Sequence, residues 1–381
     1  ATPLKALTNA KLTEFSSIFG ASQVGILTGD RKENSNAPII VGTTEILRNQ
    51  LYDIMHSGLS LDIDLVVFDE AHYLGDEERG VVWEEIMIYL PERIPLLLLS
   101  ATIGNAHQIA DWLSKIRSRL CRVVEEFVRP VPLHPLFMNP NGTLLPLMTS
   151  GKPKVSKKIH GLINSKQRLE LVRPGKLPPM GDILRVLKKF RLLPAIFFLK
   201  SRADCDQSLQ LCRQNIDPDG QRTQERAQII ADFARRFPHI ARHRQREALE
   251  HFGVGSHHSG QLPAWKLVLE ALMNKGLLDV IFATSTVAAG VNFPARSIAF
   301  FNSDRFNGFE FIPLDASQFL QMTGRAGRRG MDRVGFALAV PGKFLDVHRV
   351  ARLFTSPPAA VTSKIQINFS MVLNLLLSHT P

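Results

Sequence analysis

Short apolar runs alternate with amphipathic segments along the first third of the chain. Two segments, 81–89 and 105–115, have the spacing of helices. Strands are predicted at the apolar runs 24–27, 38–42, 65–68 and 94–99. Continuous apolar strands separated by helices are typical of a parallel sheet that is covered on both faces. We therefore predict an α/β domain over residues 1–128.

The same alternation returns in the second half of the chain. Helices are predicted within residues 203–252 and at 262–275. Strands are predicted at 195–199, 278–283, 297–301 and 334–340. This pattern indicates a second α/β domain over residues 193–350, and the polar stretch 204–250 reads as an insertion of solvated helices whose role the sequence does not reveal.

Residues 129–192 differ from both domains because they are basic. They hold 13 Lys and Arg against 2 Asp and Glu, so this segment alone carries the whole excess of 46 − 35 = +11. Asn141-Gly142 between apolar residues predicts a small hairpin within it. A basic segment between two balanced regions is typical of a connector near a phosphate backbone. A solvated linker that is basic for solubility is the alternative that charge leaves open.

Other features of the composition limit the cellular context. No run approaches the roughly 18 apolar residues of a spanning helix. The three cysteines form no CxxC pair, and no leader opens the chain, which predicts a cytoplasmic protein. The chain begins with Ala1 inside a patterned segment, which indicates a piece of something longer. An apolar helical pattern at 367–377 would likewise open a truncated third domain over residues 351–381.

The first candidate chemistry is an acidic pair that follows an apolar strand. Asp69 and Glu70 come directly after residues 65–68, at the carboxyl edge of a parallel sheet, where open α/β folds bind ligands. Asp69 could hold Mg²⁺ through water while Glu70 polarises an attacking water, as phosphoryl transfer to water requires. A helix N-terminus favoured by the macrodipole is the alternative. Ser100 and Thr102 follow the next strand, where they would relay the state of the site or cap a helix.

The second candidate chemistry is a set of arginines after a short helix in the second domain. Arg325, Arg328 and Arg329 lie among glycines within residues 321–330. Planar guanidinium groups suit a γ-phosphate whose charge grows in the transition state, whereas a solvated basic helix end is the alternative. One sheet that supplies carboxylates and another that supplies arginines predict a nucleotide site between the domains.

The ordered set of motifs resembles superfamily-two DEAD/DEAH-box helicases of the Ski-like branch, most of all the RNA helicases associated with exosome-type decay. The resemblance implies two tandem RecA-like domains, the first without its initial strand and phosphate loop, and the start of a helical or winged-helix-type C-terminal domain. Motifs Ia and Ib match residues 2–7 and 43–48, and motifs II and III match residues 69–72 and 100–102. In the second domain, motif IV matches residues 197–202, the motif that follows it 257–260, motif V 283–295 and motif VI 321–328.

The resemblance also implies roles for single residues. Catalysis would involve Asp69, Glu70, Gln321, Arg325 and Arg328, with Gln321 sensing the nucleotide, both arginines as fingers, and Mg²⁺ held by Asp69 through water. ATP would be contacted by Asp69, Glu70, His72, Ser100, Thr102, Gly290, Asn292, Arg325 and Arg328. Nucleic acid would be contacted by Thr2, Pro3, Lys5, Thr43, Glu45, Arg48, Ser201, Arg202, His257, Thr284, Thr286, Phe306 and Phe309.

A hairpin is predicted between motifs V and VI. Phe306-Asn307-Gly308-Phe309 is a two-residue turn signal, and related helicases place a wedge for the duplex junction here. The two phenylalanines would stack on the last base pair, unless the hairpin merely connects strands. His257, His258 and His72 lack the ligand spacing of a zinc site.

The chain departs from the family in one respect that matters for ATP. It contains no Gly-Lys-Ser/Thr loop, since its Gly-Lys pairs at 151, 175 and 342 are followed by Pro, Leu and Phe. These residues alone are therefore expected to bind ATP poorly and to hydrolyse little.

Together these features predict an ATP-dependent helicase or translocase with ATP and Mg²⁺ as cofactors, whose two domains open and close around a single strand. Its partner would be single-stranded or partly duplex nucleic acid, RNA rather than DNA, within an RNA-decay or repair complex and away from membranes. A DNA repair-type helicase and a nucleic-acid-binding remnant without ATPase activity are the alternatives.

Overall fold

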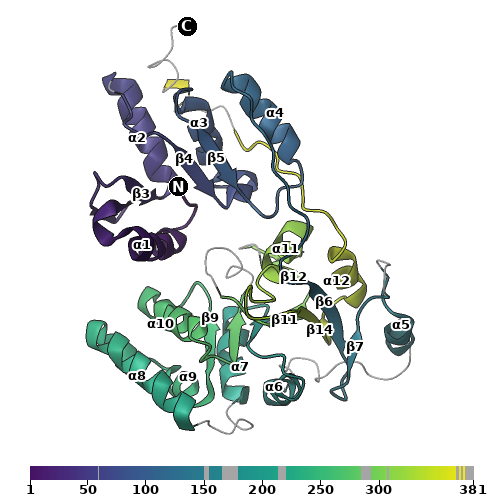
Figure 1. Ribbon diagram of the computed structural model, residues 1–381. Coiled ribbons are helices and arrows are strands. Elements are labelled where there is room, and N and C mark those ends of the chain that lie inside the picture. Colours follow the sequence, from purple (N-terminus) through teal and green to yellow (C-terminus); the bar gives the residue numbers. More distant parts are fainter. Residues whose placement is uncertain are drawn as a thin grey trace. The chain divides into compact units, whose positions relative to one another are not determined.

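The computed structural model describes residues 1–58, 60–149, 154–164, 179–212, 220–284, 293–306, 309–365, 369 and 372–373. The chain forms two compact units (Figure 1). The first unit contains residues 1–125 and 358–381, and the second contains residues 126–357. Each unit is an α/β body, as the alternating pattern predicts. Within the described residues, no helix has both the length and the apolar character needed to cross a membrane.

The first unit contains two small sheets. One has the strand order β2-β1-β3, and the other pairs β4 with β5 in parallel. Ala1 and Thr2 lie between them, because Asp69 N donates to Ala1 O and Thr2 N donates to Gly42 O. Its elements are α1 (Lys5–Phe19), η1 (Ala21–Gln23), β1 (Val24–Thr28), β2 (Arg31–Glu33), β3 (Ile39–Gly42), α2 (Thr44–Ser57), β4 (Val66–Asp69), η2 (Ala71–Gly75), α3 (Gly80–Tyr89), β5 (Leu96–Leu99) and α4 (Ala106–Ile116).

The core of the first unit lies directly beneath the predicted acidic motif. Phe68 at the end of β4 and Trp83 in α3 are both fully buried, with ring centroids 4.7 Å apart in an edge-to-face arrangement. Leu51 of α2 and Ile86 of α3 belong to the same cluster. Because large aromatic groups contribute most to core packing, this contact fixes the strand from which the acidic pair emerges.

The second unit is built on one sheet of seven strands in the order β7-β6-β14-β11-β8-β10-β9. All neighbouring strands are parallel except β6 and β7. Its elements are β6 (Leu133–Met138), β7 (Leu144–Pro146), α5 (Lys157–Asn164), α6 (Met180–Lys189), β8 (Ala195–Phe198), α7 (Arg202–Cys212), α8 (Gly220–Arg236), η3 (Pro238–Arg242), α9 (Arg246–Phe252), β9 (Val254–His257), α10 (Pro263–Asn274), β10 (Val280–Ala283), β11 (Ser297–Asn302), β12 (Asp304–Phe306), β13 (Phe311–Pro313), α11 (Ala316–Thr323), β14 (Gly335–Phe344) and α12 (Val347–Leu353).

Strand β8 shows why the strands of this sheet appear in the sequence as continuous apolar runs. Its residues alternate between two cores, with Ile196 and Phe198 in the cluster that includes Trp265 of α10. Phe197 lies in the other cluster, with Leu187 of α6. A strand whose two faces are both buried needs apolar side chains at every position, and the predicted strands 195–199, 278–283, 297–301 and 334–340 are confirmed as β8, β10, β11 and β14.

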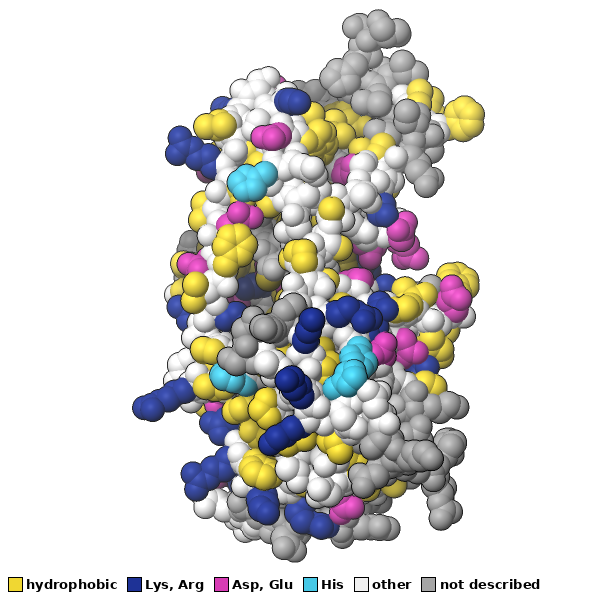
Figure 2. All heavy atoms as spheres, turned by 90° about the vertical axis from the view of Figure 1, so that its right-hand side faces the viewer, with side chains coloured by type: hydrophobic (Ala, Val, Ile, Leu, Met, Phe, Trp, Pro, Cys, Tyr) yellow, Lys and Arg dark blue, Asp and Glu magenta, His cyan; other side chains and the backbone are white. Residues whose placement is uncertain are grey.

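The structure differs from the predicted connector over residues 129–192. The hairpin is confirmed as β6 and β7, but β6 pairs with β14 and so belongs to the main sheet of the second unit. Helix α6 packs its Ile183, Leu184 and Leu187 on the core of the same unit. Among the described basic residues of this range, Lys157 and Lys158 of α5 and Lys188 and Lys189 of α6 are exposed. On the face drawn in Figure 2, basic side chains stand among hydrophobic and uncharged ones.

Residues 351–381 also differ from the expected opening of a third domain. The first of them end helix α12 in the second unit, and residues 358–365 pack on the first unit. Most of the apolar pattern at 367–377 lies outside the described residues.

Candidate nucleotide and nucleic-acid sites

Strand register places the acidic pair and the hydroxyl pair at the same edge of a sheet. Asp69 is the partner of Leu99, the last residue of β5, so Ser100 follows on the neighbouring strand at the same level. The Ser100 hydroxyl accepts a hydrogen bond from Thr102 N at 3.3 Å. It caps no helix, since α4 begins at Ala106 with Asn105 as its N-cap. The structure therefore brings Asp69, Glu70, Ser100 and Thr102 to one carboxyl edge, as the sequence predicts.

The backbone at Glu70 is strained. Glu70 has φ 59° and ψ 46°, in the left-handed region that residues other than glycine seldom adopt, at a cost of about 1–3 kcal/mol. Its amide donates to Asp69 Oδ1 at 3.1 Å, and its Oε2 lies 3.3 Å from His72 Nδ1. This turn holds the two carboxylates side by side with the Glu70 side chain 28% exposed, so the carboxylate is accessible to a ligand.

The donor set at this edge fits Mg²⁺. Mg²⁺ prefers oxygen ligands, and in nucleotide sites it binds through one or two carboxylates, the phosphates and water rather than through a cage of protein ligands. Asp69 and Glu70 supply two such carboxylates. Over the described ranges, no group of three or more His, Cys, Asp and Glu could enclose a metal ion. Bound there with phosphates, Mg²⁺ would supply charge neutralisation.

The arginine segment of the second unit follows a capped helix whose last turn is held by Arg129. Helix α11 opens with a capping box of Asp315 and Gln318 and ends at Thr323. The Arg129 guanidinium then donates to Thr323 O at 3.3 Å and to Ala326 O at 2.8 Å, and burial lowers its pKa. At Gly327, where φ is +84°, an added methyl would lie 2.6 Å from Val131 Cγ1, so only glycine fits this turn.

Asp332 holds Arg328. Its carboxylate is fully buried and accepts from Arg328 Nε at 2.8 Å, Arg328 Nη2 at 3.0 Å and Arg328 N at 3.0 Å. It also accepts from Arg296 Nε at 2.8 Å. Burial opposes ionisation of this carboxyl, but the hydrogen bonds from both arginines outweigh it and lower the pKa to about 2. The fork of Arg328 is therefore fixed in one orientation.

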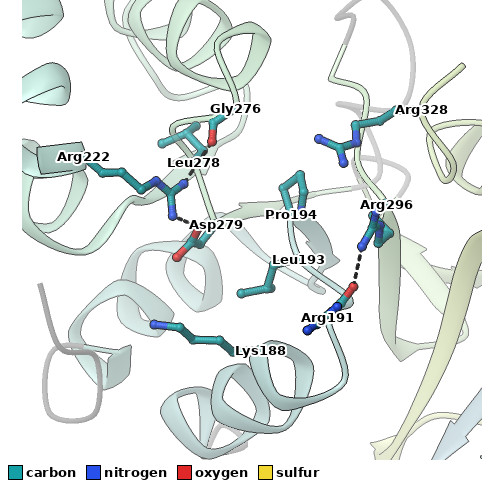
Figure 3. Close-up of a pocket in the computed structure, with 10 residues that line it drawn as sticks. All are labelled: Lys188, Arg191, Leu193, Pro194, Arg222, Gly276, Leu278, Asp279, Arg296 and Arg328. Atoms are coloured by element: carbon teal, nitrogen blue, oxygen red, sulfur yellow. Dashed lines mark hydrogen bonds and ion pairs between the residues drawn. The ribbon is translucent and has the colours of Figure 1, made fainter. Parts of the chain in front are cut away.

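Arg328 lines a basic pocket of about 370 Å³ at the amino ends of β8, β10 and β11 (Figure 3). Figure 3 shows Arg328 and Arg296 on one side and Arg222, bonded to Asp279, on the other. Lys188 and Arg191 lie along the remaining wall. With five basic side chains and a single acidic one among its lining residues, the pocket favours an anionic ligand such as a phosphate group.

The predicted nucleic-acid residues of the second unit gather at the opposite, carboxyl end of the strands. Phe198, Ala283 and His257 are in register as the final residues of β8, β10 and β9. Ser201 and Arg202 follow the first of these strands, and Thr284 follows the second. The side chain of His257 is buried, with both ring nitrogens unpartnered, so it supports this edge rather than presenting a surface.

Asp206 ties the stretch 204–250 to this edge. Its Oδ1 accepts from Gln245 Nε2 at 2.7 Å and from Ser256 Oγ at 2.7 Å, and lies 3.2 Å from His258 Nε2. Gln245 also accepts from Trp265 Nε1 at 3.2 Å. A satisfied buried polar network of this kind fixes the geometry of its members. These contacts therefore position the segment that follows β9.

The predicted nucleic-acid residues of the first unit divide into buried and accessible ones. Thr2 and Pro3 of the first segment and Thr43 of the second are buried, and the two segments meet where Thr44 N donates to Thr2 O at 3.2 Å. Lys5 is exposed and pairs with Asp30 at 2.9 Å. The partly exposed residues are Glu45 and Arg48, the latter 3.4 Å from Glu85.

Three predicted residues lie outside the described part of the chain, namely Thr286, Gly290 and Asn292. Gln321 and Arg325 are partly exposed, and the Arg325 carbonyl accepts from Ala295 N at 3.1 Å. The structure thus places the backbone of Arg325 beside the start of β11, at the same end of the sheet as Arg328.

The predicted hairpin is present as β12 and β13, but its turn is longer than two residues. Phe306 pairs with Phe311, which leaves residues 307–310 between the strands, and Asn307 and Gly308 lie outside the described residues. Phe306 and Phe309 are 48% and 94% exposed. Lys200 anchors the base, with its Nζ 3.8 Å from the ring centroid of Phe311 and 2.8 Å from Asp304 Oδ2.

Comparison with known proteins identifies the domains that carry these sites. The model of the DEAD/DEAH box helicase family matches residues 1–109, and that of the helicase conserved C-terminal domain matches residues 180–330. The chain thus carries a DEAD/DEAH-box helicase domain and a helicase conserved C-terminal domain. Both matched ranges carry the segments described above, so the acidic edge lies in the first helicase domain and the arginine segment in the second.

Several curated helicases are similar over 98% of this chain. They include the chloroplastic DExH-box ATP-dependent RNA helicase DExH15 of Arabidopsis thaliana, at 34% identity over 36% of its length. The probable helicase HelY of Mycobacterium tuberculosis is 35% identical over 44% of its length. Human superkiller complex protein 2 is 35% identical over 32% of its length, which confirms the Ski-like resemblance. The chain therefore spans less than half the length of these relatives.

Sequence reasoning missed four residues that organise these sites. They are the charged residues Arg129, Lys200, Asp206 and Asp332. Arg129 bonds to Thr323 and Ala326, which lie 194 and 197 positions further along the sequence. Only Asp332, four residues after Arg328, had a local signal, since oppositely charged residues at that spacing often pair.

Proposed function

We propose that the chain is the two-domain core of an ATP-dependent helicase or translocase that acts on single-stranded RNA. The observation that carries the proposal is the carboxyl edge where a strained Glu70 stands beside Asp69 and Ser100, in a chain that carries a DEAD/DEAH-box helicase domain. A carboxylate held at fixed geometry next to an expected Mg²⁺ site suits a residue that orients an attacking water.

In this proposal the two units act on one nucleotide. Asp69 and Glu70 would contact the phosphates and the water from the first unit, and Arg325 and Arg328 would approach the γ-phosphate from the second. Asp332 supports this assignment because it holds the Arg328 fork in one orientation before the reaction, which reduces the reorganisation needed in the transition state. Binding of ATP would favour closure of the units, and hydrolysis would favour opening.

RNA is proposed as the substrate because two of the similar relatives are named as RNA helicases. The strand would lie along the carboxyl end of β8, β9 and β10, where Ser201, Arg202 and Thr284 follow the strands. Such a surface contacts mainly phosphates, which RNA and DNA share. We therefore propose RNA because of the similar relatives and not because of contacts in the structure. Membership of an RNA-decay complex and a cytoplasmic location remain predictions.

One sequence feature favours a second candidate. The 381 residues contain no Gly-Lys-Ser/Thr loop to hold the β- and γ-phosphates. We therefore propose that these residues alone bind ATP weakly, and that hydrolysis requires a polypeptide that also carries such a loop. A nucleic-acid-binding remnant is the alternative if no such polypeptide exists.

The test is ATP hydrolysis by the natural polypeptide that contains these residues, with single-stranded RNA or DNA of the same base sequence. We expect RNA to stimulate turnover at least about tenfold more than DNA does. Equal stimulation would favour a DNA repair-type helicase, and the absence of any hydrolysis would favour the remnant. The Glu70→Gln variant should retain RNA binding while losing turnover.

A further inference from the structure

Residues 358–365 come after the second unit in sequence but are bound to the first. Gly104 N donates to Ala359 O at 3.1 Å. Val361 N donates to Asn105 Oδ1 at 2.8 Å, and Asn105 Nδ2 donates to Val361 O at 2.9 Å. The Asn105 amide therefore pairs with both backbone groups of one residue, as a neighbouring strand does. In Figure 1 the yellow end of the chain runs past α4 and reaches α3. We call residues 358–365 the return segment.

A buried carboxylate holds the far end of the return segment. Glu84 lies in the apolar helix α3 and is only 6% exposed. Its Oε1 accepts from Lys364 N at 2.6 Å, and its Oε2 accepts from Ser363 Oγ at 2.7 Å. A buried carboxylate without such partners would be strongly unfavourable. Helix α3 and the return segment therefore stabilise each other through the carboxylate of Glu84.

The contact is close enough to require glycine on the side of the first unit. A methyl group added at Gly104 would lie 2.3 Å from the carbonyl oxygen of Pro358. One added at Gly80 would lie 2.8 Å from Lys364 Cγ, although the carbonyl oxygen of Leu74 in the first unit, at 2.5 Å, also excludes it. Val361 in turn packs on the apolar core that contains Phe68 and Trp83. Polar, steric and apolar contacts thus all hold the return segment at one position on the first unit, which we call its seat.

Residues just C-terminal to the two candidate nucleotide motifs form this seat. Glu84 lies in the helix reached from Asp69 and Glu70 through η2, and Gly104 and Asn105 come shortly after Thr102. We propose that Glu84 and Asn105 are positioning residues, which bind the return segment so that the chain leaving the second unit fixes both motif-bearing segments of the first. The bearing on catalysis rests on the proposed function, whereas the positioning itself does not.

Amide hydrogen exchange on the full chain tests the proposal without ATP. In Glu84→Met, which keeps side-chain length and helix propensity, exchange at Lys364 and Ile365 should become at least about tenfold faster, and exchange in residues 71–75 at least about threefold faster. Glu85→Met is the matched control, because Glu85 is also 6% exposed on α3 but contacts Arg48 instead. It should leave exchange at residues 358–365 unchanged.

Two outcomes would overturn the proposal. If Glu84→Met leaves exchange at Lys364 as in the unmodified chain, Glu84 does not hold the segment. If the segment is released while residues 71–75 and 102–104 exchange as before, the segment is merely docked and positions nothing. Neither result depends on ATP hydrolysis, so a failure here is distinct from a failure of the proposed function.

A second pair of variants guards against a general loss of folding. Gly104→Ala places a methyl against Pro358 without removing any charge, whereas Gly29→Ala meets nothing within 4 Å. Tryptic cleavage after Lys364 should become at least about fivefold faster in Gly104→Ala and remain unchanged in Gly29→Ala. Equal cleavage rates in the two variants would contradict the seat.

Where the natural polypeptide hydrolyses ATP, Glu84→Met should lower kcat and leave the Kd for single-stranded RNA unchanged. An unchanged kcat would count against positioning.

Discussion

Asp332 is the residue on which the orientation of Arg328 depends. Asp332→Asn removes the buried charge and leaves Arg328 and Arg296 with a weaker acceptor, so we expect the free energy of unfolding at pH 7 to fall by about 3 kcal/mol. Urea unfolding monitors the change. Asp232→Asn is the control, since Asp232 forms an exposed pair with Arg235, and exposed pairs of this kind add little to stability.

The same substitution predicts a pH dependence. The pKa of Asp332 is lowered from 3.8 to about 2 in the folded chain, so its stabilisation is complete above pH 4 and is lost as the pH falls towards 2. The difference between the unmodified chain and Asp332→Asn should therefore be constant from about pH 8 to pH 5 and shrink below pH 4. A difference that changes between pH 8 and pH 5 would contradict the assignment.

His257 predicts a loss of stability that begins at a higher pH. Burial, with added repulsion from Lys266 and His258, lowers its pKa from 6.5 to about 3. The unfolded chain binds this proton below pH 6.5 and the folded chain does not, so stability falls as the pH drops from 6.5 towards 3. His257→Leu removes this penalty, and its stability relative to the unmodified chain should be about 2 kcal/mol more favourable at pH 5 than at pH 8. Equal differences at both pH values would show that His257 accepts its proton in the folded chain.

At the scale of elements, the hairpin of β12 and β13 is the feature with the clearest role to test. Phe306 and Phe309 expose aromatic surface on which bases can stack, at about 1–3 kcal/mol per base. Changing both to Ala in the natural polypeptide should reduce duplex unwinding at least about tenfold and leave RNA-stimulated ATP hydrolysis within about twofold. Phe190→Ala is the control, because Phe190 is a comparably exposed phenylalanine at 47%. Equal loss of unwinding and hydrolysis would argue against a wedge.

The elements also show how far sequence alone could predict the fold. Strands such as β8 and β10 were predictable because burial on both faces forces apolar residues at every position. The acidic edge followed from the rule that parallel strands end together. Strand β6 was predicted only as half of a small hairpin in a basic connector, and its place in the main sheet was missed because that place depends on its pairing with β14. The seat of the return segment depends on contacts between residues far apart in the sequence, for which no local pattern exists. Asn105 and Val361 are 256 positions apart, and Glu84 and Lys364 are 280 positions apart.

At the scale of the whole molecule, the excess of basic residues predicts salt-sensitive binding. A protein that neutralises phosphates releases condensed counterions, so the affinity for single-stranded RNA should fall at least about tenfold between about 50 and 200 mM salt. Fluorescence anisotropy with a labelled oligonucleotide measures this directly. An affinity that is independent of salt would mean that stacking, and not the phosphate backbone, dominates binding.

The proposed function requires two units of one chain to act on the same nucleotide. In that proposal the carboxylates of Asp69 and Glu70, in the first unit, and the guanidinium groups of Arg325 and Arg328, in the second, would each supply part of the chemistry. If both halves serve one step, removing either should abolish it, and removing both should cost no more than removing one.

RNA-stimulated ATP turnover of the natural polypeptide, measured for Glu70→Gln, Arg328→Ala and the double variant, is the most direct test. We predict that each single variant lowers kcat by about 1,000-fold, that the double variant is no slower than the slower single one, and that RNA affinity changes less than about threefold. Turnover by Arg328→Ala at the rate of the unmodified protein, or losses that multiply in the double variant, would contradict a shared nucleotide site.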